Sequence, residues 1–164
     1  MSSILKVDTI QNTGGTTGLT IDSSGRPLTP ARPAFKAYSS LTGWQSFGGT
    51  SFVKMPFNSV QHNIGTHYDT SNYKFVVPCN GVYYFYAQFY HDGNTHGQMI
   101  IKENGSTEHA FSDNSNQGDT VHTTVTLELT VNDYIETFGK ISNSDTTDWY
   151  AYPSYSYFCG YLIG

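Results

Sequence analysis

Residues 82–90, VYYFYAQFY, are the stretch that most limits how this chain can fold. They are rich in residues that favour β-strands, and successive side chains of a strand point to opposite faces. One face would carry Val82, Tyr84, Tyr86, Gln88 and Tyr90, and the other Tyr83, Phe85, Ala87 and Phe89. A strand in a two-layer sandwich needs only one apolar face. The second face must therefore be buried against something else.

The sequence after residue 30 indicates strands and turns. We expect strands over residues 34–39, 50–55, 73–77, 81–91, 98–102, 120–131, 134–141 and 155–163. Asn-Gly pairs at 80–81 and 104–105 are typical of the turns between strands. No stretch keeps a helical period for three turns, so no helix is available to cover a sheet. Strands at this spacing predict an all-β sandwich or jelly roll.

We expect the second apolar face of residues 82–90 to be buried against another copy of the chain. The C-terminal stretch SYSYFCGYLI, residues 154–163, is also apolar on both faces. Tyrosine suits a subunit interface because its ring is large and apolar while its hydroxyl can find a partner. The predicted interface contains Tyr84, Tyr86, Tyr90, Tyr155 and Tyr157.

The first 30 residues differ from the rest of the chain. They contain two short alternating stretches joined by Gly, Thr and Ser, and Pro27 and Pro30 close the segment. Their few aliphatic side chains cannot form an independent core. The segment is therefore either a disordered tail or a piece that orders against other chains. We divide the chain into an N-terminal attachment segment, residues 1–30, and one domain, residues 31–164.

Composition excludes several classes of function. The net charge of −5 and the lack of any basic run argue against a nucleic-acid partner. No apolar run is long enough to insert into a membrane, and the N-terminus has no apolar core of a signal peptide. Synthesis in the cytoplasm is expected. The sequence also has no nucleophile elbow, phosphate loop or zinc-protease motif, so we do not expect an enzyme.

The central and C-terminal motifs resemble those of the C1q domain, in the C1q/tumour-necrosis-factor superfamily. The matching positions are Phe57-x-x-Val60-x-x-Asn63-x-Gly65-x-x-Tyr68-Asp69, Tyr73-x-Phe75-x-x-Pro78-x-x-Gly81, Asn132-Asp133-Tyr134-Ile135 and Phe158-Cys159-Gly160-Tyr161-Leu162. "PAF" at 33–35 is similar to the start of the domain. The resemblance covers residues 31–164 and implies a ten-stranded jelly-roll sandwich that assembles as a homotrimer.

The N-terminal segment LKVDTIQNTGGTTGLTIDSSGRP resembles the start of tail-fibre and virion appendage proteins of marine bacteriophages. It implies a phage structural protein located in the virion. The tip would bind a host surface glycan or protein as a trimer, and the segment would contact other virion proteins. The alternative is a non-viral recognition module, bacterial or invertebrate, that is secreted or at the cell surface. No Gly-x-y repeat precedes the domain, which disfavours an animal relative.

The two cysteines leave two possibilities open. The family topology would bring the strands after Cys79 and around Cys159 side by side, so a bridge is conceivable. Two buried, reduced thiols are the better prediction because the chain is made in the cytoplasm.

Calcium is the one cofactor that the resemblance raises, and none is required. Some C1q-like trimers bind calcium through loop carboxylates, and residues 102–113 fall where relatives carry such acids. The candidate ligands are Glu103, Asp113 and Asp119. Calcium takes six to eight oxygen ligands, and this stretch lacks the fixed spacing of an EF-hand. Solvated turns are the simpler interpretation.

The stretch DWYAYPSYSY, residues 148–157, carries the most prominent loop aromatics. Trp149, Tyr150 and Tyr152 would lie in or beside a loop between the last two strands. Exposed rings at a loop tip can stack on sugars or anchor a protein partner. Alternatively, these rings pack on the neighbouring subunit.

Overall fold

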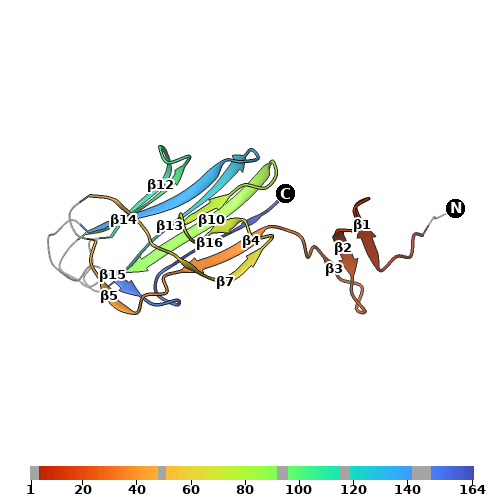
Figure 1. The fold of residues 1–164 in the computed structure, drawn as a ribbon, viewed down its shortest axis with the longest axis horizontal. Helices are drawn as coiled ribbons and strands as arrows, with labels where there is room; N and C mark the ends of the chain where they lie inside the picture. The colour runs from red at the N-terminus through yellow and green to blue at the C-terminus, as the bar shows by residue number, and fades with distance from the viewer. Residues whose placement is uncertain (1–3, 48–50, 92–95, 115–118, 142–148) are drawn as a thin grey trace.

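Two antiparallel sheets form the body of the protein (Figure 1). The structure is a computed structural model, and it describes residues 4–47, 51–91, 96–114, 119–141 and 149–164. The described residues form strands, turns and irregular segments, with no helix among them. In particular, no helix in these ranges is long and apolar enough to cross a membrane.

The first sheet has five strands in the order β13-β10-β16-β4-β7. They are β4 (Ala34–Tyr38), β7 (Ser59–Ile64), β10 (Gly81–Tyr90), β13 (Thr120–Leu129) and β16 (Tyr157–Leu162). The second sheet runs β12-β11-β14-β9-β8, and β6 pairs with β14 outside this order. Its strands are β6 (Val53–Lys54), β8 (Tyr68–Asp69), β9 (Lys74–Val76), β11 (Gly97–Glu103), β12 (Thr107–Asn114) and β14 (Tyr134–Ile141). This is the expected jelly-roll sandwich, with β6 added to the ten implied strands.

The core lies between the two sheets and is strongly aromatic. Phe35 stacks on Phe75 across the sandwich with ring centroids 4.9 Å apart, and its ring meets Phe158 edge-on at the same distance. Strand β10 contributes one complete face to this core, namely Tyr83, Phe85, Ala87 and Phe89. Each buried ring of this size stabilises the fold by about 1.5–3 kcal/mol. The sandwich therefore buries one face of β10, as the alternation predicts.

Two turns show why particular residues occupy them. Asn104 and Gly105 have φ of 51° and 75°, and they join β11 to β12. Two successive residues with positive φ are typical of a tight hairpin turn, so the hairpin predicted here is confirmed. Asn132, in the turn between β13 and β14, has φ of 74°. Asparagine tolerates this left-handed conformation better than other non-glycine residues.

The N-terminal residues form a separate small sheet. Its strands β1 (Thr9–Gln11), β2 (Thr17–Ile21) and β3 (Pro27–Leu28) pair in that order. Figure 1 shows this sheet projecting from the end of the sandwich at which β4 begins. Ile10 and Leu28 remain about half exposed, at 49% and 48%. The sheet is thus formed by hydrogen bonds and has little apolar core of its own.

A two-stranded sheet closes the opposite end of the sandwich. Strands β5 (Gly43–Gln45) and β15 (Trp149–Ala151) pair antiparallel, with Tyr150 opposite Trp44. Neither strand was expected from the sequence, nor were β7 and β12. The last predicted strand begins at Tyr157 rather than Tyr155, because residues 153–155 form a turn. Of the strand predicted over 50–55, residue 50 lies outside the described ranges and Val53–Lys54 pair with β14.

Candidate functional site

The first candidate site is the outer face of the β13-β10-β16-β4-β7 sheet. We call it the outer tyrosine face, and its rings are Tyr84, Tyr86, Tyr157 and Tyr161. Tyr86 stacks on Tyr157 with centroids 5.7 Å apart, and Tyr84 lies 5.4 Å from Tyr161. The ammonium of Lys36 sits 4.4 Å from the centre of the Tyr157 ring. The four rings thus form two contacting pairs across β10 and β16, and Lys36 of β4 lies against one of them.

This face is only half-buried within one chain. Tyr161 is 47% exposed, and Tyr84, Tyr86 and Tyr157 are intermediate. Partial burial already raises the pKa of Tyr86 to about 12, because burial disfavours the charged phenolate. The neighbouring strand β13 behaves differently, since His122, Thr124, Thr126 and Glu128 are exposed on its outer face. The four rings therefore lie on β10 and β16, with Lys36 and Tyr38 of β4 on one side of them and His122 of β13, on which Tyr86 stacks, on the other.

A second candidate site is an aromatic pocket of about 530 Å³. Its walls are the rings of Trp44, Tyr90, Tyr150, Tyr152 and Tyr155. Trp44 meets Tyr150 nearly edge-on at 5.1 Å, and Tyr155 meets Tyr150 at 5.5 Å with the rings at 87°. Figure 1 shows the β5–β15 pair at the end of the sandwich opposite the N-terminal sheet. The pocket therefore lies at the far end from the N-terminal segment.

The backbone around this aromatic pocket is held by one buried hydroxyl. Ser156 is fully buried, and its Oγ donates a 2.7 Å hydrogen bond to the carbonyl oxygen of Tyr150. The same Oγ accepts a 3.2 Å hydrogen bond from the amide of Tyr90. Gln88 adds a 2.9 Å hydrogen bond from Nε2 to the carbonyl oxygen of Tyr155. Strands β10 and β15 and the turn before β16 are thereby fixed relative to one another.

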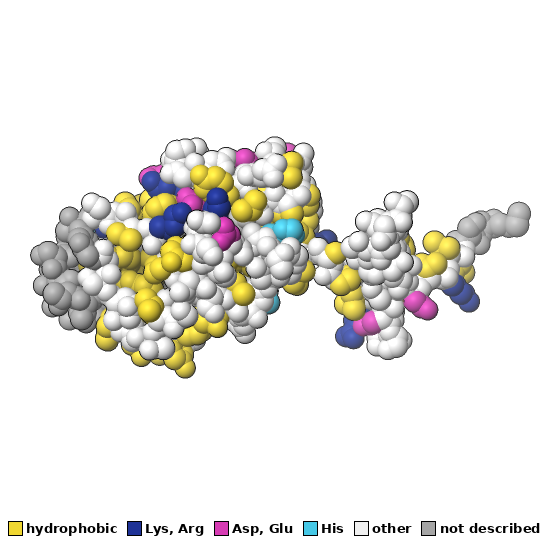
Figure 2. Space-filling view, in the orientation of Figure 1, with side chains coloured by type: hydrophobic (Ala, Val, Ile, Leu, Met, Phe, Trp, Pro, Cys, Tyr) yellow, Lys and Arg dark blue, Asp and Glu magenta, His cyan; other side chains and the backbone are white. Residues whose placement is uncertain are grey.

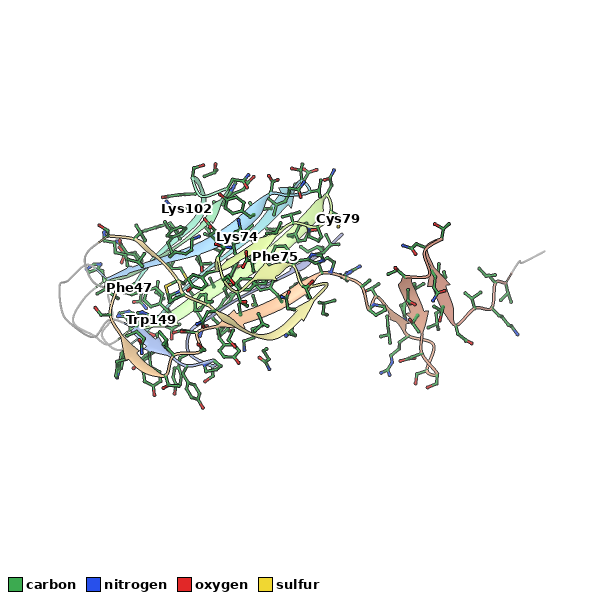
Figure 3. The ribbon with its side chains drawn as sticks, viewed as in Figure 1. Phe47, Lys74, Phe75, Cys79, Lys102 and Trp149 are labelled. Carbon is green, nitrogen blue, oxygen red and sulfur yellow. The ribbon has the colours of Figure 1, made fainter. Side chains whose placement is uncertain are left out.

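Trp149 does not belong to the exposed aromatic group in which the sequence placed it. It is 2% exposed and packs between Phe47 and Phe57, with centroids 6.1 Å and 6.5 Å away. Figure 3 shows Trp149 and Phe47 together at the same end of the sandwich. Neighbouring residues of a strand point to opposite faces, so Trp149 faces the core and Tyr150 faces outwards. The expectation that Trp149 is exposed is wrong.

The other predicted aromatics fall on two different surfaces. Tyr150 and Tyr152 line the aromatic pocket, and Tyr152 is 48% exposed. Tyr84, Tyr86 and Tyr157 belong to the outer tyrosine face. Tyr90 and Tyr155, which we grouped with them, lie beyond the end of the β10–β16 pairing and line the pocket. The structure thus separates the five predicted interface tyrosines into two adjoining groups.

Trp44 is the pocket residue that the sequence analysis missed. It is 40% exposed and belongs to the three-residue strand β5, which begins at Gly43, whose φ is 79°. A lone tryptophan among polar and glycine residues, outside any predicted strand, was the available signal. Its pairing with Tyr150 joins residues far apart in the sequence, so no local pattern indicates it.

The three predicted calcium ligands do not converge. Glu103 pairs across the hairpin with Thr107, whereas Asp113 pairs with Gln98, five residues away along β11. At ~3.3 Å per residue this is about 16 Å, too far for one ion. Glu103 contacts the imidazole of His109 at 2.6 Å, and Asp113 accepts a 2.9 Å hydrogen bond from Gln98. The third candidate, Asp119, accepts a hydrogen bond from the amide of Thr120.

The carboxylates therefore have local partners. The hydrogen bond from Gln98 holds the pKa of Asp113 below its usual range. Within the described ranges no group of three or more His, Cys, Asp or Glu side chains is arranged to hold a metal ion. Both Glu103 and Asp113 lie on strands rather than in the loop that we expected.

Both cysteines are free thiols in the structure. Their strands are indeed neighbours, because Cys159 pairs with Tyr86 of β10. Burial raises the pKa of the Cys159 thiol. Cys79 is exposed, which contradicts the prediction that both thiols are buried. It lies in the turn before β10, and Figure 3 shows it at the end opposite Trp149.

Charged groups are concentrated away from the aromatic pocket. On the face drawn in Figure 2, most Lys, Arg, Asp and Glu side chains gather over the upper part of the sandwich, where Figure 1 labels β12 and β14, and on the N-terminal sheet. None of the five lining side chains of the pocket is charged. The arrangement offers ring faces and phenol hydroxyls, which are groups for binding rather than for bond-breaking chemistry.

Comparison with known proteins identifies the family. The model of the C1q domain matches residues 34–163. The chain therefore belongs to the C1q domain family. Domains of this family are non-enzymatic binding modules, so the chain is not an enzyme. A comparison with curated protein sequences finds no significant match.

Solved structures share the fold at low sequence identity. The globular domain of zebrafish complement 1qA protein is 17% identical, with a TM-score of 0.55 over 80% of this chain and 98% of that chain. Murine APRIL at pH 5.0 is 11% identical, with a TM-score of 0.63 over 80% and 99%. The Eiger TNF of S. frugiperda is 13% identical, with a TM-score of 0.52 over 82% and 94%. The fold is therefore that of the C1q/TNF jelly rolls.

Proposed function

We propose that this member of the C1q domain family is a homotrimeric binding module at the tip of a bacteriophage tail fibre or virion appendage, where it contacts the host cell surface. Domains of the C1q/TNF fold typically assemble as trimers. The observation that carries the proposal is the outer tyrosine face, because a half-buried group of rings on one side of a sandwich calls for a partner.

The energetics of the outer tyrosine face favour association. Complete burial of a large side chain contributes about 1.5–3 kcal/mol, and these rings are already partly buried within the chain. When the chains associate, burial of the still exposed part of each ring contributes the rest of this free energy. Cation–π contact between Lys36 and Tyr157 adds to this gain when water is excluded. Tyr84, Tyr86 and Tyr157 are the central interface residues of the proposed trimer.

The positions of the N-terminal sheet and the aromatic pocket suit a domain at the tip of a fibre. The N-terminal sheet lies at one end of the sandwich and the aromatic pocket at the other (Figure 1). We propose that the N-terminal segment contacts other virion proteins, so that the opposite end faces the host. In a trimer three copies of this end act together, and avidity can exceed single-site affinity by about two to four orders of magnitude.

The virion assignment rests on the N-terminal sequence, which resembles the start of marine bacteriophage appendage proteins. The genes beside this one test that assignment. Genes for tail, baseplate or capsid proteins as neighbours are the expected result. A neighbourhood without any phage gene would remove the virion role and leave a non-viral recognition module.

Binding itself is tested with the purified chain. The host to be tested is the bacterium in whose genome the phage genes are found. Fluorescently labelled protein should attach to its cells, and unlabelled protein should compete for the same sites. Equal attachment to unrelated cells would contradict host recognition.

A further inference from the structure

We infer that the aromatic pocket of Trp44, Tyr90, Tyr150, Tyr152 and Tyr155 is a binding site for an uncharged sugar ring of a cell-surface glycan. This inference rests on the proposed binding function and names the ligand class that the pocket would recognise. It goes beyond the sequence-based aromatic prediction, because two of the lining rings come from strands β5 and β10 rather than from the loop after β15.

The chemistry of the walls matches a sugar ring. A pyranose has an apolar face of C–H groups and an edge of hydroxyls. Aromatic rings pack against such a face, and phenol hydroxyls both donate and accept hydrogen bonds. Four of the five lining residues are tyrosines and the fifth is Trp44, whose indole N–H is a further donor. The pocket thus offers both kinds of contact that the ring requires.

The ligand should carry no charge. The lining residues include no Asp, Glu, Lys, Arg or His, so no salt bridge would offset the loss of hydration of an acidic or basic sugar. Neutral hydroxyls lose less on desolvation and can be satisfied by the phenols. Uncharged glycans are therefore preferred over uronic or sialic acids.

The pocket is preorganised for this role. Ser156 ties the Tyr90 amide to the Tyr150 carbonyl through its buried Oγ. The amides of Tyr155 and Ser156 both donate to the carbonyl oxygen of Tyr152, at 2.9 Å each. The rings also contact one another, as between Tyr90 and Tyr155 at 5.6 Å. Binding to such a fixed set of rings costs little conformational entropy.

The shape suits part of a longer chain. The volume of about 530 Å³ falls within the usual range of small-molecule sites, roughly 300–1,000 Å³. Trp44, Tyr152 and Tyr155 are 40%, 48% and 45% exposed, so the pocket is open on one side. A sugar residue can therefore enter while the rest of its glycan continues into solvent.

The two tryptophans give a direct readout of this site. The chain has only two, and Trp149 is 2% exposed whereas Trp44 is 40% exposed. Acrylamide should quench the emission of Trp44 and leave that of Trp149 largely unchanged. A ligand stacked on Trp44 should protect it from quenching. The probes are neutral oligosaccharides on an array (gluco-, manno- and galacto-oligomers), with hits repeated in solution titrations.

Matched variants localise the effect. Trp44→Ala should weaken binding of the neutral oligosaccharide at least tenfold and abolish the protected fraction of emission. Trp44→Phe keeps a ring and should retain most of the affinity. Phe111→Ala, which removes a 57% exposed ring on β12, should leave binding unchanged. All variants should keep the oligomeric mass of the parent chain.

Several results would overturn the inference. One is that the protein binds no neutral oligosaccharide. Another is that it binds only charged glycans or choline. A third is that the Trp44→Ala variant keeps the full affinity of the parent chain. Trp44 that is inaccessible to acrylamide in the assembled protein would show that a neighbouring subunit covers the pocket. Failure of the proposed function looks different, because the parent chain would then attach to no host cell. Trp44→Ala protein that still attaches normally would refute the pocket alone.

Discussion

Replacing Ser156 by alanine should loosen the aromatic pocket while leaving the jelly roll folded. The hydroxyl is fully buried and makes two hydrogen bonds to backbone groups, at 2.7 Å to the Tyr150 carbonyl and 3.2 Å from the Tyr90 amide. The variant leaves both backbone groups without this partner. Water cannot easily replace it, because the space vacated by one oxygen atom is smaller than a water molecule.

The expected loss follows from the number of groups affected. The Tyr150 carbonyl keeps a 3.1 Å hydrogen bond from the amide of Tyr152, so the Tyr90 amide is the group left unsatisfied, at a cost of about 1–3 kcal/mol. For a chain of this length each kcal/mol lowers Tm by about 2–4 °C, which gives a fall of roughly 2–12 °C. Ligand binding at the pocket should also weaken, because the rings of Tyr90 and Tyr150 lose their fixed spacing.

Thermal unfolding followed by circular dichroism measures the loss, and Ser154→Ala is the matched control. Ser154 is exposed two residues earlier in the same turn, so its replacement should change Tm by less than about 2 °C. Equal Tm values for Ser156→Ala and Ser154→Ala would refute the role assigned to the buried hydroxyl.

Three further predictions concern the N-terminal segment, the thiols and the outer face. Deletion of residues 1–30 should leave Tm within a few degrees, because the segment adds little to the core, and a collapse of the fold in calorimetry would contradict this. A thiol reagent should label Cys79 quickly and Cys159 slowly without denaturant, because Cys79 is exposed and burial raises the pKa of Cys159; equal labelling rates, read by mass spectrometry, would argue otherwise. Burial raises the pKa of Tyr86 to about 12, so its contribution to stability is complete below pH 10 and is lost as the pH rises towards 12. Tyr86→Phe, which cannot ionise, should reduce the loss of stability measured by urea unfolding between pH 10 and 12, and an unchanged pH profile would count against this assignment.

Strand β10, which is apolar on both faces, was the most predictable part of the structure. Alternation alone assigns Tyr83 and Phe85 to one face of β10 and Tyr84 and Tyr86 to the other, and the structure confirms that the first face forms the core. The polar outer face of β13 was equally readable, because Thr and His alternate there with aliphatic side chains. Period-two patterns are reliable in long strands because a slip by one residue would expose the whole core face.

The two short strands at the end of the sandwich that carries the aromatic pocket could not be predicted from the sequence in this way. Strands β5 and β15 have three residues each, which is too short for alternation to be recognised, and their pairing joins distant parts of the chain. The adjacent Trp149 and Tyr150 nevertheless could not both be exposed, since neighbours in a strand face opposite sides. Glu103 and Asp113 were close in sequence yet lie at opposite ends of a hairpin, because strands extend about 3.3 Å per residue.

Assembly through the outer tyrosine face is the central claim. Sedimentation equilibrium of the full chain at micromolar concentration tests it most directly. The account predicts a single species with three times the 18.2 kDa chain mass. A species with the mass of one chain, stable on further concentration, would contradict it.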